Sequence, residues 1–320
     1  ELIIEVARMF ASLATYDPVE DRFHISGVMG PDEYHDGYPD APGGGLRDNA
    51  YTNVLASWVC ERAAEVLHVL AGHPGRDLTD RLHITPEETG LWSRLARRLA
   101  VPFQRDNVIS QFHGYDDLSE LDWPRYRAKY GNVGRLDLIL EAENDETNRY
   151  KLAKQADVLM LIYLLAPAGV IDQLHLLGYS LTGSDLERTV EYYLARTSDG
   201  STLSRVVHAS VLARIDGSRA WEVFREALVA DLDDTQGGTT REGIHLGAMS
   251  GTVDLVVRAF AGLQTEADAR TFAPRLPGQL GALGVQVQYR GTRMECSRNG
   301  GDLHTRSQTA PRPPHPRGRT

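Results

Sequence analysis

Four ionisable side chains crowd one short loop near the start of the chain and could carry acid–base chemistry. Asp32, Glu33, His35 and Asp36 directly follow Gly30-Pro31. Neighbouring carboxylates raise one another's pKa, and a carboxyl group that stays protonated can donate its proton to a glycosidic oxygen. Composition alone leaves two other interpretations open: a solvated acidic loop, or a metal site built from Glu33, His35 and Asp36. The metal interpretation lacks a recognised ligand spacing such as H-E-x-x-H.

Three further polar clusters stand where apolar helices are predicted to begin. They are Lys154-Gln155, Ser201-Thr202 and His245. The N-terminal end of a helix presents free N–H groups and a partial positive charge, which suits an anion such as phosphate. Each cluster also has a purely structural interpretation. In that interpretation, the first cluster is a pair of exposed residues at a helix start, and the second is a helix N-cap with its neighbour. The third is a structural histidine held by hydrogen bonds.

Apolar residues recur every three or four positions along most of the chain, which predicts a succession of helices. Thr85 and Pro86 supply an N-cap and a proline at the first helical position, and Pro167-Ala168-Gly169 is typical of a joint. The chain opens in a helical pattern from Leu2 to Phe10, so we expect it to begin inside a domain. The other helices are expected at 50–71, 85–99, 135–143, 150–165, 184–196, 202–215, 217–230 and 241–262.

The predicted helices fall into two kinds. A helix that is apolar around its circumference is buried, and an amphipathic helix covers it. Alternation of the two kinds predicts an inner and an outer layer, an α/α toroid, with the polar clusters at one end. The apolar helices begin near Ala50, Lys154, Thr202 and Glu242, and the amphipathic helices lie at 85–99, 184–196 and 217–230.

The pattern changes after Leu263. Residues 284–291 alternate apolar and polar side chains, which predicts a strand, and 292–296 is its candidate hairpin partner. The rest is rich in Pro, Arg and Gly, which predicts disorder. We therefore divide the chain into a helical domain at 1–265, a linker with the start of a β domain at 266–297, and a disordered tail at 298–320.

Composition narrows the classes of function. The net charge is −10, which argues against nucleic acid, whose phosphates attract basic surfaces. The longest apolar run, residues 156–166, is about half the ~20 residues that cross a bilayer, so we expect no membrane partner. No signal-peptide pattern opens the chain. Cys60 and Cys296 lie far apart and indicate no disulfide framework, so we expect a cytoplasmic protein.

Taken together and in this order, the motifs resemble glycoside hydrolase family 65, the inverting phosphorylases of maltose, trehalose, kojibiose and related α-glucosides. GPDEYH and KQADV are the specific signals, and the resemblance covers residues 1 to about 296. The matching segments are Gly27–His35, Asp48–Asn53, Gln111–Tyr115, Lys154–Val158, Ser201–Ser204, Glu242–His245 and Pro274–Pro277.

The resemblance implies a mostly α fold, a partial (α/α)6 barrel followed by the start of a small C-terminal β domain. It places the family's general acid at Glu33. The implied reaction is a single displacement, in which inorganic phosphate cleaves an α-linked glucose disaccharide to β-glucose 1-phosphate and a sugar. No metal and no cofactor are expected beyond phosphate as co-substrate. A second copy of the chain, in a homodimer, is a candidate partner.

The resemblance also assigns the binding residues. Lys154 and Gln155 fall on positions that hold the glucosyl unit. Ser201, Thr202 and His245 fall on the phosphate site, where Thr202 replaces a serine common in the family. Phosphate itself is the nucleophile, so the reaction needs no protein base.

The sequence departs from the family in places. The loop between His35 and Asn49 is longer than the short acidic linker of characterised members, which puts the acceptor pocket in question. The family's N-terminal β-sandwich and first barrel helices are expected to be missing. Two rival functions remain open: an inverting, trehalase-like hydrolase that uses Glu242 or another residue of 231–242 as base, and a non-catalytic carbohydrate-binding toroid.

Overall fold

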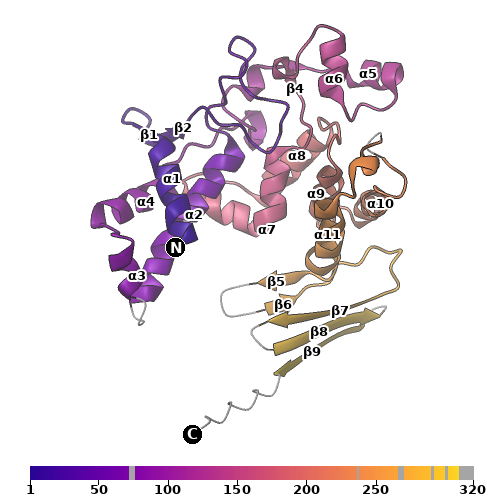
Figure 1. Cartoon of the computed structure of the whole chain (residues 1–320). Coiled ribbons are helices and arrows are strands. Elements are labelled where there is room, and N and C mark those ends of the chain that lie inside the picture. Colours follow the sequence, from indigo (N-terminus) through magenta and orange to yellow (C-terminus); the bar gives the residue numbers. More distant parts are fainter. Residues whose placement is uncertain (72–75, 236–237, 266–269, 290–291, 300–301, 310–320) are drawn as a thin grey trace. The chain divides into compact units, whose positions relative to one another are not determined.

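The structure is a computed structural model that describes residues 1–71, 76–235, 238–265, 270–289, 292–299 and 302–309 (Figure 1). The chain divides into two compact units, Glu1–Val207 and His208–Thr320, and each is described by itself.

Helices build most of the first unit, with short strands at its edges (Figure 1). Two two-stranded ladders accompany the helices: an antiparallel hairpin of β1 (Ala14–Asp17) and β2 (Arg22–Ile25), and a parallel pair of β3 (Ser119–Glu120) and β4 (Tyr150–Lys151). The helices are α1 (Leu2–Leu13), α2 (Ala50–Ala71), α3 (Arg76–Arg81), α4 (Pro86–Arg98), α5 (Trp123–Tyr130), α6 (Leu136–Ala142), α7 (Asp157–Leu176), α8 (Gly183–Leu194) and α9 (Thr202–Leu212), which runs on into the second unit.

The helices of the first unit pack in the two layers that the sequence predicts. The apolar helices α2 and α7 contact each other, α4 packs on α2, and α8 packs on α7. Trp92, Leu95 and Ala96 are the buried side chains of α4, while its basic residues lie on the opposite side. The amphipathic helices therefore cover the apolar ones, as expected for a double-layered α/α arrangement.

The start of α4 is set by its sequence, as predicted. The Thr85 side chain accepts a hydrogen bond from the Glu88 N–H at 3.2 Å, and the Glu88 carboxylate accepts one from the Thr85 N–H at 3.0 Å. Pro86 occupies the first turn, where a backbone N–H would have no partner within the helix. The absence of an N–H group in proline therefore costs no hydrogen bond there. The two capping hydrogen bonds therefore define Pro86 as the first residue of the helix.

The helix predicted at 150–165 is displaced in the structure. α7 begins at Asp157 and ends at Leu176, and two helical halves meet within it at a kink at Ala166, so the joint predicted at 167–169 is confirmed to within one residue. Proline breaks the regular helix locally, and Ala166 has a φ of 59° there. Buried residues on both sides of the break, such as Leu161 and Leu174, keep the two halves in the core.

Counted across this kink, α7 is long and apolar enough to cross a bilayer, judged by length and composition. The core helix of a soluble protein passes the same test, and α7 packs against α2 and α8. Its first residue, Asp157, is fully buried and hydrogen-bonded to the loop of Glu33.

The second unit continues the helical pattern and then changes to β structure. The helix predicted at 241–262 begins later, at Leu246, because Thr239–Glu242 form a 3-10 turn and Gly243 has a φ of 145°. A π-helical turn, Val256–Phe260, extends it. Its elements are α10 (Gly217–Leu228), α11 (Leu246–Leu255), β5 (Leu263–Thr265), β6 (Arg270–Phe272), β7 (Ala282–Tyr289), β8 (Thr292–Asn299) and β9 (Asp302–Thr309).

In the C-terminal sheet, the predicted strand pair is confirmed and the predicted disorder from residue 298 is wrong in part. β7 and β8 pair antiparallel, with Val285 opposite Cys296, as the alternating pattern predicts. The predicted disorder from residue 298 is wrong for 302–309, because this segment forms β9 and pairs with β8 along its whole length. Backbone hydrogen bonds to β8 stabilise β9, and the polar composition of this segment gives no sign of such pairing. Residues 310–320 lie outside the described part.

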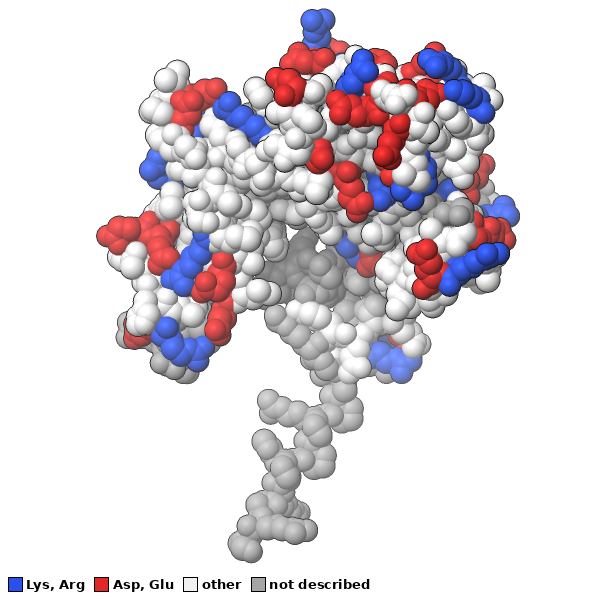
Figure 2. Space-filling view, turned by 45° about the horizontal axis from the view of Figure 1, so that its top comes forward, with Lys and Arg blue, Asp and Glu red and all other residues white. Residues whose placement is uncertain are grey.

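The charged side chains are mixed on the surface. Figure 2 shows acidic and basic residues interspersed over the face that it draws, rather than gathered into one basic patch.

Both cysteines are free and buried. Burial raises the pKa of the Cys60 thiol to about 12, and burial also raises the pKa of Cys296. A thiol reacts as its thiolate, so neither cysteine should be labelled by a thiol reagent at pH 8 in the native protein. Timed labelling with and without urea measures this. Two thiols should react only after unfolding, and rapid labelling of Cys60 in the native state would contradict the packing.

Candidate active site

A long loop between β2 and α2 carries Glu33 and is closed at its neck. Val28 and Leu46 exchange two backbone hydrogen bonds of 3.3 and 2.7 Å, which bring the two ends of the loop together. Gly45 has a φ of 75°, and a Cβ atom there would lie 2.6 Å from the Cα of Gly27. Only glycine fits this close approach, so the neck has a fixed geometry.

The buried carboxylate of Asp32 organises the loop. Its Oδ2 accepts hydrogen bonds from Gln111 Nε2 at 2.7 Å and pairs with His35 Nδ1 at 2.9 Å. Its Oδ1 accepts the backbone N–H of Lys154 at 2.8 Å and that of Tyr34 at 3.4 Å. One side chain thus ties together three segments that are far apart in the sequence, and it holds the backbone on both sides of Glu33.

A second buried carboxylate, that of Asp157, supports the same loop. It accepts hydrogen bonds from the backbone N–H of Asp32 and from Asn49 Nδ2, both at 2.6 Å. Complete burial, together with the nearby charge of Asp32, raises the pKa of the Asp157 carboxyl well above its usual range. Two acids are therefore held close together beneath the loop, and the donors around them offset the cost of burial.

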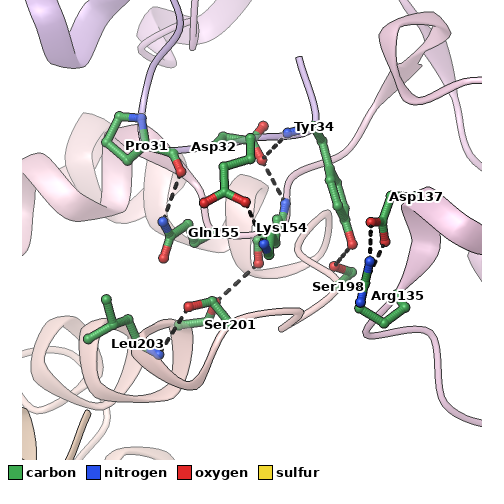
Figure 3. Close-up of polar contacts among 12 residues, drawn as sticks. Pro31, Asp32, Tyr34, Arg135, Asp137, Lys154, Gln155, Ser198, Ser201 and Leu203 are labelled. Carbon is green, nitrogen blue, oxygen red and sulfur yellow. Dashed lines mark hydrogen bonds and ion pairs between the residues drawn. The ribbon is translucent and has the colours of Figure 1, made fainter. Parts of the chain in front are cut away.

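The Glu33 side chain faces Lys154. Its Oε2 lies 2.6 Å from Lys154 Nζ, and 64% of the Glu33 side chain is exposed against 22% for Lys154. Gln155, the next residue, donates from Nε2 to the backbone oxygen of Pro31 at 2.8 Å (Figure 3). The structure therefore brings together three of the predicted site residues, Glu33, Lys154 and Gln155.

Tyr34 fastens the other side of the loop. Its hydroxyl accepts a hydrogen bond from Ser198 Oγ at 3.2 Å (Figure 3). It also accepts one from the Leu136 N–H at 3.2 Å and donates one to the Gly134 oxygen at 3.0 Å. Burial raises the pKa of Tyr34 to about 12, so the hydroxyl keeps its proton. This contact joins the Glu33 loop to the segment that leads to Ser201.

Ser201 and Thr202 lie at the start of α9, close to Lys154. Ser204 Oγ donates to the Lys154 backbone oxygen at 3.1 Å. A Cβ atom on Gly200 would lie 3.0 Å from Lys154 Cγ.

Ser201 Oγ accepts the Leu203 N–H at 3.2 Å, which is the capping contact of the structural interpretation. Thr202 is largely buried.

His245 lies in the second unit and precedes α11. Its Nδ1 is 2.5 Å from Asp231 Oδ1, and its backbone N–H donates to Asp231 Oδ2 at 2.9 Å. The hydrogen bond from His245 holds the pKa of the Asp231 carboxyl below its usual range. An Nδ1 proton shared with Asp231 fixes the ring orientation and directs Nε2 away from this carboxylate.

The proposed metal ligands of the loop are otherwise engaged. Both ring nitrogens of His35 meet protein oxygens, Nδ1 that of Asp32 and Nε2 that of the Tyr150 backbone at 3.0 Å. Asp36 Oδ1 accepts from Asn148 Nδ2 at 2.7 Å. His35 and Asp36 therefore position the loop, and Glu33 alone of the three points its charge toward Lys154.

The supporting residues were not predicted as site residues. Asp32 was noted only as a member of the acidic cluster, and Asn49, Gln111 and Asp157 only as parts of matching motifs. A signal does exist in retrospect. Gln111 and Asp157 are polar residues in segments rich in apolar residues, where a polar side chain needs a buried partner, whereas the polar loop of Asp32 gives no such signal.

Gly30→Ala should destabilise the protein, because the added Cβ would lie 1.8 Å from Asp157 Oδ2 and 2.6 Å from Asn49 Nδ2. We expect a loss of at least about 1–3 kcal/mol in the free energy of unfolding, the usual cost of overpacking. Urea denaturation measures it. Gly183→Ala is the matched control, since nothing lies within 4 Å of its added Cβ. Equal stability of both variants would show that the Glu33 loop does not pack as described.

Comparison with known proteins places the chain in a family. The profile described as the glycosyl hydrolase family 65 central catalytic domain matches residues 1–254. An uncharacterized glycosyl hydrolase of Mycobacterium tuberculosis is 48% identical over 290 residues, which cover 91% of this chain and 22% of that protein. Trehalose 6-phosphate phosphorylase of Lactococcus lactis is 36% identical over 304 residues, 95% of this chain and 38% of that protein.

A solved structure shares the fold. A putative kojibiose phosphorylase from the human microbiome superposes with a TM-score of 0.77 at 19% identity, over 96% of this chain and 42% of that one. This likeness supports a mostly α architecture, a partial (α/α)6 barrel with the start of a β domain. The chain spans between about a fifth and two fifths of the length of these relatives. The chain belongs to glycosyl hydrolase family 65, and residues 1–254 match its central catalytic domain.

Proposed function

We propose that this chain provides catalytic residues for the inverting phosphorolysis of an α-linked glucose disaccharide, with Glu33 as the proton donor. The observation that carries the proposal is the buried Asp32, which fixes Glu33, Lys154 and their backbones as one assembly. A solvated acidic loop would not need such an anchor. The family match adds the class of reaction.

The proposed reaction has one step. The bond between the anomeric carbon and the leaving sugar's oxygen breaks, and that oxygen takes the proton of Glu33. A phosphate oxygen forms the new bond to the anomeric carbon from the opposite face, which inverts its configuration and yields β-glucose 1-phosphate. Phosphate arrives as a nucleophile, so no protein carboxylate has to activate water.

Lys154 and Gln155 have the role of holding the glucosyl unit. Lys154 Nζ lies 2.6 Å from Glu33, in the position where sugar hydroxyls would compete for both charged groups. An ionised carboxylate paired with an ammonium has no proton to give. We therefore infer that the arriving sugar separates the pair and that the exposed Glu33 carboxylate then takes a proton from water, which it passes to the leaving oxygen.

Phosphate binding is proposed for Ser201, Thr202 and His245. The start of α9 supplies free N–H groups and a partial positive charge, and Ser201 and Thr202 add hydroxyl donors. The Asp231 carboxylate at Nδ1 fixes the orientation of the His245 ring, and Nε2 on the other ring edge is the atom proposed to face phosphate. These three assignments rest on the family resemblance and on the chemistry of the groups.

The proposed substrate is of the trehalose, maltose or kojibiose type. Relatives of this chain carry the names trehalose 6-phosphate phosphorylase, kojibiose phosphorylase and α,α-trehalose phosphorylase. The first of these is 36% identical and the other two are 29% and 28% identical, so a phosphorylated disaccharide belongs in the substrate screen.

The test is phosphate dependence. The intact protein is incubated with trehalose, trehalose 6-phosphate, maltose or kojibiose, with and without inorganic phosphate, and glucose 1-phosphate and free glucose are measured. Release of β-glucose 1-phosphate only when phosphate is present supports the proposal. Free glucose at the same rate without phosphate would instead identify a hydrolase, and sugar binding without any product would identify a non-catalytic module.

A further inference from the structure

The hairpin of β1 and β2 gathers a histidine and two carboxylates outside the Glu33 assembly. Asp17 ends β1, Glu20 lies in the turn, and His24 lies in β2. Thr15 pairs with His24 across the hairpin, so Asp17, two residues further on, projects from the same face as His24. The ligand atoms of Asp17, Glu20 and His24 all lie within 4.8 Å of one another.

His24 presents a buried nitrogen toward this cluster. The residue is 8% exposed, and its Nδ1 lies 2.7 Å from Asp48 Oδ2. Nε2 has no hydrogen-bond partner among the described residues, although Glu20 Oε2 lies 3.4 Å away. When Nδ1 donates to Asp48 in the neutral ring, the Nε2 lone pair faces a carboxylate oxygen. Two acceptors at this distance repel each other unless a proton or a metal ion lies between them.

We propose that Asp17, Glu20 and His24 bind one divalent transition-metal ion of the zinc class, with Nε2 of His24 as the nitrogen ligand. One imidazole and two carboxylates form a ligand set that suits Zn²⁺, whose bonds to N and O are about 2.0–2.2 Å. Glu20 is exposed in a turn, so its side chain can close the remaining distance.

Asp48 completes the arrangement as a positioning residue. A carboxylate that accepts the other ring N–H of a ligating histidine fixes its tautomer and raises its basicity. The guanidinium of Arg47 lies on this side of the ring, with Nε 3.3 Å from Asp48 Oδ2 and Nη2 3.2 Å from His24 Nδ1. Its charge is therefore balanced by Asp48, on the ring edge opposite to the metal.

A cavity adjoins the cluster and leaves room for water as a further ligand. It has a volume of about 420 Å³ and is lined by Asp17 and His24 together with Thr15, Tyr16, Ser26 and Arg47. Asp48 directly precedes Asn49, which hydrogen-bonds Asp157 beneath the Glu33 loop. A metal ion here would stabilise the end of that loop and take no part in the transfer of the sugar.

Isothermal titration of the metal-free intact protein with Zn²⁺ tests the site. We expect one saturable site in the wild type and an affinity lower by at least about tenfold in Glu20→Gln, whose exposed side chain puts folding at little risk. Asp21→Asn is the matched control: it removes an acid from the same turn, and asparagine tolerates the φ of 51° at this position. It should bind as the wild type does.

The outcomes separate the alternatives. His24→Gln should remove binding while an intact fold is checked by circular dichroism, and Mg²⁺, which prefers oxygen ligands, should bind more weakly than Zn²⁺. Zn²⁺ bound equally by wild type, Glu20→Gln and His24→Gln would place the ion elsewhere and overturn the proposal. Absence of binding in the wild type would overturn it too, and would leave His24 as a hydrogen-bonded structural residue of the hairpin.

Discussion

Replacing Glu33 with glutamine should slow phosphorolysis about 10²–10⁴-fold, the usual contribution of a general acid. Glutamine keeps the shape of the side chain but has no acidic proton to give to the leaving sugar. The fold should survive, because 64% of the Glu33 side chain is exposed and its ion pair with Lys154 lies at the surface. Initial rates at saturating phosphate measure the loss, and circular dichroism with urea denaturation measures the fold.

Asp40→Asn is the control for this variant. Asp40 is an exposed acid of the same loop, so its replacement changes the charge of the loop by the same amount. It should keep nearly full activity. If Glu33→Gln retained more than about a tenth of the wild-type rate, general-acid catalysis by this residue would be excluded. If it failed to fold, the role of Glu33 would be structural.

Asp32→Asn should have the largest effect on stability, with a loss of about 3 kcal/mol in the free energy of unfolding. The Asp32 carboxylate accepts from four groups, among them Gln111 Nε2 and the Lys154 N–H. An amide offers one acceptor oxygen, and its NH₂ group would face a donor. At least one buried donor would then lose its partner.

The free energy is measured by urea denaturation at pH 7, with Asp40→Asn again as control, expected within about 0.5 kcal/mol of the wild type. Activity should fall with stability, since Asp32 holds the backbone of Lys154. A variant with wild-type stability would show that the buried network does not form as described.

Local sequence signals predicted the helices well where caps and periodicity agree. The predicted 50–71 matches α2 residue for residue, and Thr85-Pro86 fixed the start of α4. These local signals failed where contacts between distant segments determine the position of a helix. Pro167 does mark the break at Ala166, but the helix predicted from residue 150 begins only at Asp157, because Tyr150 and Lys151 pair with β3 instead. The short hairpin of β1 and β2 was not predicted, since four-residue strands hold too little periodicity.

The sequence predicted only part of the site, because several of its contacts join residues that are far apart in the chain. Glu33, Lys154 and Gln155 come from motifs, and the family resemblance joined them. The network beneath them links Asp32 to Lys154 and Asn49 to Asp157, pairs that are more than 100 residues apart. No local pattern encodes such contacts. The third strand of the C-terminal sheet escaped prediction because backbone pairing, rather than apolar side chains, defines it.

The central claim is that Glu33 protonates the leaving sugar, and a leaving group that needs no proton tests it most directly. α-Glucosyl fluoride releases fluoride without general-acid help, so the rates of Glu33→Gln and wild type are compared on this donor and on the disaccharide, both with phosphate. The predicted result is a defect of about 10²–10⁴-fold on the disaccharide that shrinks to less than about tenfold on the fluoride. An equal defect on both donors would contradict the role of Glu33 as proton donor.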